Sequence, residues 1–219
     1  MCGRFAIHAS EKEIIDHFHL KQGFSMRARY NLAPTQTIPI ICEMGGAIEF
    51  ARWGFLASWV KAEGDQIPLG HINARFESLA EKPSFRHAFK NQRCLIPASG
   101  YFEWLTVANK KHPYYVYLRA KPLIAFAGIW SFWKMPNGEM LRTCAIITMA
   151  ATGPLQKFHE RMPVIISPDN YALWLQRTNN QTKLEQMFVL PTQENVGIHA
   201  VSSRMSNPQF EGIECIKSL

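Results

Sequence analysis

The chain has 219 residues, 47% of them apolar and 19% charged, and its 24 Lys and Arg against 17 Asp and Glu give a net charge of +7. A chain of this length buries roughly 70% of its unfolded surface, so it needs no disulfide or metal to fold. The apolar content excludes a disordered chain. No uncharged apolar run reaches the ~18 residues of a membrane span, and the first residues lack the apolar core of a signal peptide. We therefore expect a cytoplasmic protein with no membrane partner.

Local signals predict a helix and a hairpin near the start of the chain. Ser10 followed by Glu13 is typical of a capping box, and it opens a helix that should end between Leu20 and Gly23. Apolar runs at 38–42 and 47–53, separated by two glycines, predict a β-hairpin. Residues 56–70 are punctuated by Pro and Gly and predict a long loop with an exposed Trp59.

The middle of the chain is rich in β-branched and aromatic residues, which favour strands. Predicted strands cover 94–104, 114–119, 123–133, 143–149 and 197–202. Predicted helices cover 84–91, a segment that begins at Ser167-Pro168, and a segment through Leu184, Met187 and Phe188. Strands and short helices are mixed without repeats or a linker. We therefore expect one α+β domain over residues 1–219, with a curved, mostly antiparallel, barrel-like sheet flanked by short helices.

One of the five cysteines is set apart by its position. They are Cys2, Cys42, Cys94, Cys144 and Cys215, with no C-x-x-C pair and no His at metal spacing, so we expect no metal site. Removal of Met1 would leave Cys2 with a free α-amine of pKa ~8 and a thiol of pKa ~8.5. Such a 1,2-aminothiol condenses with an aldehyde to an imine, and the sulfur then closes a thiazolidine ring. The alternative is that Cys2 is an ordinary apolar residue at the start of a strand.

Three further residues are candidates for the same site. Glu103 lies among large aromatics in an apolar strand, where burial would raise its pKa toward that of a general acid or base; alternatively it faces solvent. His159 can donate to an oxyanion or pass a proton, or it is merely packed or exposed. Asn73 has a short amide that can hold an amine or carbonyl, or it is a turn residue.

Basic and aromatic residues are interleaved in a way that suits single-stranded nucleic acid. Between Arg75 and Lys121 there are nine Lys or Arg and three acids. Arg binds phosphates bidentately, and aromatic rings stack unpaired bases for ~1 to 3 kcal/mol each. Alternatively, these aromatics belong to the core and most Arg to a solvated surface. No duplex-reading motif is visible. The candidates are Arg4, Arg52, Arg75, Arg86, Arg161 and Arg204, with Trp53, Trp59, Phe76, Tyr101 and Trp104.

Seven motifs in order resemble the SRAP family, the SOS-response-associated peptidase-like proteins that process abasic sites. They are MCGRF at the start, YNLAPTQ from Tyr30, RWGF from Arg52, INARFES from Ile72, RCLIPASGYFEW from Arg93, FAGIW from Phe126 and FHERMPVII from Phe158. The likeness runs from residue 2 to about 203, and the tail follows the family pattern only loosely. Glu160 stands where other members often carry Asp or Asn.

The resemblance implies a DNA-protein crosslinking enzyme with lyase-like and autoproteolytic chemistry and no cofactor. Its substrate would be abasic single-stranded DNA, including junctions with duplex, bound by a monomer that becomes nucleoid-associated on DNA. Cys2 would be the nucleophile, Asn73 would position its amine, Glu103 would shuttle protons in ring opening and in reversal, and His159 would assist the sugar hydroxyl or oxyanion. Arg4, Arg75 and Arg161 would hold phosphates, with Trp59 and Trp104 wedged near the bases.

Two other functions fit the same residues. The Cys, Glu, His and Asn set suits an N-terminal-nucleophile cysteine peptidase that acts on its own N-terminus or on other proteins. A module that grips single strands without forming a bond would instead show salt-dependent affinity and no preference for the lesion.

Overall fold

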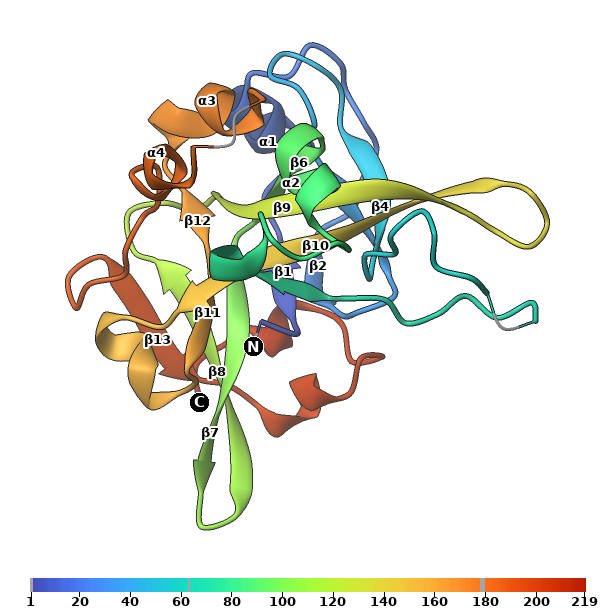
Figure 1. The fold of residues 1–219 in the computed structure, drawn as a ribbon. Helices are drawn as coiled ribbons and strands as arrows, with labels where there is room; N and C mark the ends of the chain where they lie inside the picture. Colours follow the sequence, from blue (N-terminus) through green and yellow to red (C-terminus); the bar gives the residue numbers. More distant parts are fainter. Residues whose placement is uncertain (1, 63, 178–179) are drawn as a thin grey trace.

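Two long antiparallel strands, β9 (Ile124–Lys134) and β10 (Met140–Ala150), form the centre of the larger sheet (Figure 1). The computed structural model describes residues 2–62, 64–177 and 180–219. One edge of β10 pairs first with β9 and then with β11, and its other edge pairs with β4 and then β5. The remaining strands of this sheet are β3 (Thr37–Ile40), β4 (Glu49–Trp53), β5 (Asn73–Arg75), β6 (Arg93–Ala98), β11 (Arg161–Pro163) and β12 (Ile165–Ile166).

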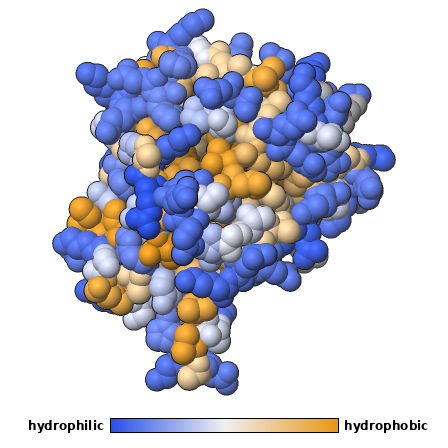
Figure 2. Space-filling view, turned by 90° about the vertical axis from the view of Figure 1, so that its left-hand side faces the viewer, coloured by the Kyte–Doolittle hydropathy of each residue, from blue (hydrophilic) through white to orange (hydrophobic). Residues whose placement is uncertain are grey.

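The smaller sheet has the strand order β13-β8-β7-β1-β2, and together the two sheets form a nearly closed, barrel-like arrangement. Its strands are β1 (Phe5–Ile7), β2 (Arg29–Leu32), β7 (Gly100–Val107), β8 (Lys110–Leu118) and β13 (Val196–Ala200). The β7–β8 hairpin projects below the rest of the molecule in Figures 1 and 2. Its two-residue turn, Ala108-Asn109, has positive φ at both positions, which matches the twist of the strands.

Short helices cover the outside of the sheets. They are α1 (Glu11–Phe18), α2 (Arg86–Asn91), α3 (Tyr171–Leu175) and α4 (Gln181–Glu185), with short 3-10 turns at Phe76–Ser78, Gly153–Lys157, Pro168–Asn170, Ser203–Ser206 and Ile213–Cys215. The predicted capping box is confirmed, since Ser10 accepts from the Glu13 amide and the Glu13 side chain accepts from the Ser10 amide. In the part of the chain that the structure describes, no helix combines the length and apolar character needed to cross a bilayer.

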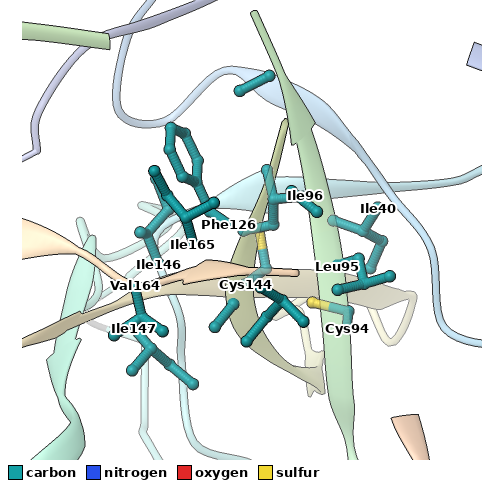
Figure 3. Packing of buried hydrophobic residues seen from close by; sticks show 14 of the residues in the cluster. Ile40, Cys94, Leu95, Ile96, Phe126, Cys144, Ile146, Ile147, Val164 and Ile165 are labelled. Carbon is teal, nitrogen blue, oxygen red and sulfur yellow. The ribbon is translucent and has the colours of Figure 1, made fainter. Parts of the chain in front are cut away.

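The hydrophobic core lies between the two sheets. Figure 3 shows how side chains from β3, β6, β9, β10 and β12 converge there. Phe126 of the larger sheet makes edge-to-face contacts with Phe5 and Tyr101 of the smaller one, with ring centroids 5.8 and 5.9 Å apart. Aromatic pairs of this geometry add to the stabilisation from apolar burial. These contacts join the two sheets through the core and so support the site described below.

The α+β, mostly antiparallel fold is confirmed, but three predicted boundaries are wrong. The strand predicted over 94–104 is two strands, because the chain leaves the larger sheet at Ser99, whose amide donates to the Ala6 carbonyl. The helix predicted through Phe188 ends at Glu185, because Phe188 pairs with Ile166 as an extended bridge. The first helix ends at Phe18, since His19 adopts a left-handed cap.

Candidate active site

Cys2 is fully buried, and it lies beside Glu103 and Asn73. The antiparallel register of β1 on β7 pairs Phe5 with Tyr101, and the Phe102 amide donates to the Arg4 carbonyl, so the chain before Arg4 continues along β7 toward Glu103. The amide Nδ2 of Asn73 donates to the carbonyl oxygen of Cys2 at 2.9 Å. Three predicted site residues, distant in sequence, are thus brought together.

Glu103 is only 4% exposed, which rules out the alternative that it faces solvent. Strand alternation puts Glu103 and Tyr101 on the inner face of β7 and Phe102 on the other. Burial raises the pKa of Glu103 to about 7. Burial, and secondly the charge of Glu103, raise the pKa of the Cys2 thiol well above its usual range. At neutral pH the thiol is therefore protonated and lies next to a carboxyl group that can accept or donate a proton.

A polar face formed by β5, β10 and β11 continues the site. In register, Asn73 lies opposite Ile146, Arg75 and Pro163 lie on either side of Thr148, and Arg161 lies opposite Ala150. Side chains alternate along a strand, so Asn73, Arg75, Thr148 and Arg161 all emerge on the same face of the sheet. Thr148 is not predictable from the sequence, since a threonine inside an apolar strand run gives no distinguishing signal.

Three buried polar atoms on this face have no hydrogen-bond partner among the described residues. They are Asn73 Oδ1, Thr148 Oγ1 and Arg161 Nε. Buried polar groups in native proteins are nearly always satisfied, so a cluster of unsatisfied ones calls for an explanation such as a bound ligand. The set contains an acceptor, a donor and a hydroxyl that can serve as either, which suits a ligand that is rich in oxygen and nitrogen.

His159 precedes β11 at the same end of β10. Its Nδ1 accepts a hydrogen bond from the Arg161 amide at 2.9 Å, so in the neutral ring the proton is on Nε2. Partial burial lowers its pKa, which favours that neutral form. The ring can therefore offer Nε2–H as a hydrogen-bond donor at neutral pH.

The Arg161 guanidinium is bound by Glu77, a residue of the INARFES motif for which the sequence predicts no role. Nη1 and Nη2 donate to the two carboxylate oxygens, each at 2.8 Å, and Nη2 also donates to the Thr148 carbonyl at 2.6 Å. Arg75, in contrast, is exposed, and its side chain makes no hydrogen bond or ion pair within the described part of the chain. Arg161 and Glu77 are 84 positions apart, and nothing in the sequence indicates that they pair.

Arg4 and Trp104 are both tied to the C-terminal segment 203–211. The Arg4 guanidinium donates to the Asn31 side chain at 2.7 Å and to the carbonyls of Met205 and Ser206 at 2.9 and 2.8 Å. The indole of Trp104 donates to Ser206 Oγ at 3.3 Å. This segment, which follows the family pattern only loosely, therefore helps to hold two predicted DNA contacts.

Trp59 lies apart from these residues. It is 63% exposed and lines a cavity of about 500 Å³ together with Arg86, Phe132 and Met140. Met140 begins β10, whereas the Asn73 and Arg75 pairings lie toward its other end. The structure does not bring Trp59 next to Cys2.

Several residues suggested for nucleic-acid contact belong to the core instead. Trp53, Phe76 and Tyr101 are buried, so they cannot stack on bases. Among the other basic residues between Arg75 and Lys121, Arg93 is buried, and it donates to backbone carbonyls of Phe89, Trp174 and Gln176. Over residues 2–62, 64–177 and 180–219, no group of three His, Cys, Asp or Glu side chains is placed to hold a metal ion. Met1 lies outside the described residues.

A family model, SOS response associated peptidase (SRAP), matches residues 1–208. The chain belongs to the SRAP family. An abasic site processing protein of Bacillus subtilis, YoqW, is 36% identical over the full length of both chains. The abasic site processing protein HMCES of Xenopus tropicalis is 25% identical, and the match covers 87% of this chain and 66% of HMCES. A solved structure from Bacteroides thetaiotaomicron shares the fold at a TM-score of 0.85, with 23% identity and full coverage of both chains.

Proposed function

We propose that this SRAP protein processes abasic sites in single-stranded DNA by forming a covalent crosslink through Cys2. Loss of Met1 would free the α-amine of Cys2, which condenses with the aldehyde of the ring-opened sugar to an imine and releases one water. The thiol sulfur then bonds to the imine carbon, the C=N bond becomes a single bond, and the thiol proton passes by way of Glu103 to the nitrogen, which becomes the N–H of the thiazolidine. The names of the relatives support the substrate. The observation that carries the proposal is the hydrogen bond from Asn73 to Cys2, beside buried Glu103.

Each neighbour of Cys2 has a distinct role in this reaction. Asn73 holds the Cys2 carbonyl, and its buried Oδ1 is left to accept from the α-amine. Glu103, with a pKa of about 7, takes the proton of the thiol during ring closure and returns it in the reverse reaction. His159 donates Nε2–H to the sugar hydroxyl or to the oxyanion that forms as the sugar ring opens.

The DNA backbone would approach over the polar face of β5, β10 and β11. Arg75 and Arg161 lie on either side of β10, opposite Thr148 and Ala150 respectively, and would each meet a phosphate. Arg4 would add a further cation, and Trp104 and Trp59 would wedge against bases, which suits single strands and their junctions with duplex. We propose that the protein acts on this DNA as a monomer.

The test is adduct formation on a denaturing gel. The Met-free protein, verified by intact mass, is incubated with a single-stranded oligonucleotide that carries one abasic site. We expect an adduct that survives denaturation and is absent for Cys2→Ala and for the unmodified oligonucleotide. Cys42→Ala is the matched control, since it removes a cysteine outside the site and should leave the adduct yield unchanged. An adduct that persists in Cys2→Ala would overturn the proposal.

A second proposed activity is that the same residues remove Met1. Glu103 lies beside the Cys2 thiol and can accept its proton, as an amide-cleaving cysteine requires. Intact masses of wild type, Cys2→Ala and Glu103→Ala test it. Retention of Met1 in both variants but not in wild type is the expected result. Loss of Met1 in all three would show that a separate aminopeptidase suffices.

A further inference from the structure

We infer that Glu77 competes with the DNA backbone for Arg161, so that Arg161 binds DNA only when a phosphate displaces this internal carboxylate. The inference rests on the proposed function, because it assumes that single-stranded DNA crosses the face that carries Cys2. It adds a residue with an opposing role: Glu77 restrains DNA binding, whereas the neighbouring cations promote it.

The contact geometry makes Glu77 a substitute for a phosphate. Both terminal nitrogens of Arg161 donate to the two carboxylate oxygens at 2.8 Å, which is the bidentate arrangement that a guanidinium also forms with phosphate. A phosphate cannot use the same pair of donors while Glu77 holds them. The ion pair also cancels the charge that would attract the phosphate, so Arg161 contributes little to long-range attraction in this state.

The two partners differ in their freedom to move. The Arg161 side chain is 11% exposed, and its Nη2 is also anchored to the Thr148 carbonyl. The Glu77 side chain is 52% exposed and lies in the short 3-10 turn that follows β5. When a phosphate arrives, the carboxylate can therefore rotate into water while Arg161 keeps its place. Arg75, two residues earlier, is exposed and already available.

This arrangement makes the two arginines contribute at different stages. Arg75 meets any strand that touches the face, whereas Arg161 is released only for a strand that lies close enough to replace Glu77. Replacement of the Glu77 carboxylate by a DNA phosphate uses part of the binding free energy. The affinity for DNA that lies only loosely on the surface is therefore lower. Glu77 thus reduces affinity for a strand that lacks the lesion while it leaves Arg161 available to a crosslinking strand.

The test is the salt dependence of DNA affinity in a Cys2→Ala background, which prevents adduct formation. Fluorescence anisotropy is measured with an unmodified single-stranded oligonucleotide at several salt concentrations. We expect Glu77→Gln to tighten binding roughly three- to tenfold at low salt and to steepen the slope of log K against log salt by ~0.7, the value for one additional phosphate contact on a single strand. Glu77→Asp keeps the charge but shortens the reach, and it should give a smaller gain.

Two controls separate this effect from net charge and from structural damage. Glu194→Gln removes the same charge at an exposed position in the 192–195 turn and should leave the slope unchanged. In an Arg161→Met background, Glu77→Gln should no longer tighten binding, and thermal unfolding verifies that each variant is folded. An effect of Glu77→Gln equal to that of Glu194→Gln, or weaker binding, would overturn the inference alone. Absence of DNA binding by the Cys2→Ala parent would overturn the proposed function as well.

Discussion

The side-chain amide of Asn73 donates a hydrogen bond to the backbone carbonyl of Cys2 at 2.9 Å and joins two residues that are 71 positions apart. Asn73 belongs to β5, which is held by parallel pairing to β10, the strand at the centre of the larger sheet. Cys2 precedes β1 of the smaller sheet. The bond therefore links the two sheets at the proposed nucleophile and fixes the backbone of Cys2, whereas the sulfur takes no part in it and donates to the Arg4 carbonyl at 3.9 Å.

Asn73→Ala should slow adduct formation about 10- to 100-fold, because a misplaced nucleophile loses the benefit of a fixed geometry. Adduct yield against time on a denaturing gel measures the rate, and intact mass verifies that Met1 is removed to the same extent. Asn91→Ala is the control, since within the described part of the chain the Asn91 side chain bonds only to the His87 carbonyl of its own helix. Equal rates for the two variants would mean that Asn73 has no positioning role.

The pH dependence of crosslinking should show the pKa of Glu103, which is about 7 because burial disfavours its charged form. If the carboxylate accepts the thiol proton, the rate rises as pH increases through 7. Glu103→Gln should slow the reaction and remove this inflection, and only the one from the α-amine, near pH ~8, should remain. Initial rates between pH 5 and 9 measure it. A wild-type profile without an inflection near 7 would contradict the role.

The same carboxyl group should cost stability at high pH. Its folded pKa of about 7 lies above the unfolded value of ~4.3, so between these values the folded state binds more protons, and the free energy of unfolding falls as pH rises. Glu103→Gln removes the ionisable group and therefore this loss of stability at high pH. We expect it to raise Tm at pH 8 relative to wild type by more than it does at pH 4. Calorimetry at the two pH values measures the difference, and an equal shift at both would refute the coupling.

Elements that depend on neighbours in sequence were predicted well. The capping box of α1 and the hairpin of β3 and β4 around two glycines are both present, because each is determined by a few consecutive residues. The break at Ser99 was missed although Pro97 and Gly100 flank it. What bends the chain there is a bond from the Ser99 amide to the Ala6 carbonyl in a strand 93 residues earlier, and local propensity contains no information on it.

The candidate site, too, could be predicted from the sequence only where a residue's own chemistry or motif identified it. Cys2, Glu103 and Asn73 were selected for their chemistry and their motifs, and the structure places them in contact or within electrostatic reach. Their neighbours Thr148 and Glu77 were missed, since what distinguishes them is position on a shared face and a partner 84 residues away. Side-chain type alone does not reveal either property.

Arg93 should be among the most important single side chains for stability. It is buried, donates to the carbonyls of Phe89 and Trp174 at 2.5 and 2.7 Å, and lies 5.4 Å from the centre of the Trp174 ring. Arg93→Met keeps much of the apolar volume but leaves these carbonyls without a donor. We expect a loss of about 2 to 4 kcal/mol in the free energy of unfolding. Urea denaturation measures it, with exposed Arg119→Met as the control; equal midpoints would refute this role.

Asn31 should determine whether the C-terminal segment 203–211 stays attached. It is fully buried, its Nδ2 donates to the carbonyls of Met205, Asn207 and Phe210 at 2.8 to 3.0 Å, and its Oδ1 accepts from Arg4. Asn31→Ala leaves all of these groups without their shared partner, which should cost about 2 to 4 kcal/mol.

The segment should then detach before the sheets unfold, because three of its carbonyls lose the amide that they share. Trypsin cleavage after the exposed Arg204, followed by intact mass, is expected to be at least tenfold faster in Asn31→Ala than in wild type. Asn207→Ala is the matched control, since it truncates an exposed asparagine of the same segment whose side chain, among the described residues, bonds only to the Gln209 amide. Cleavage at the wild-type rate in Asn31→Ala would show that the segment is held by other contacts.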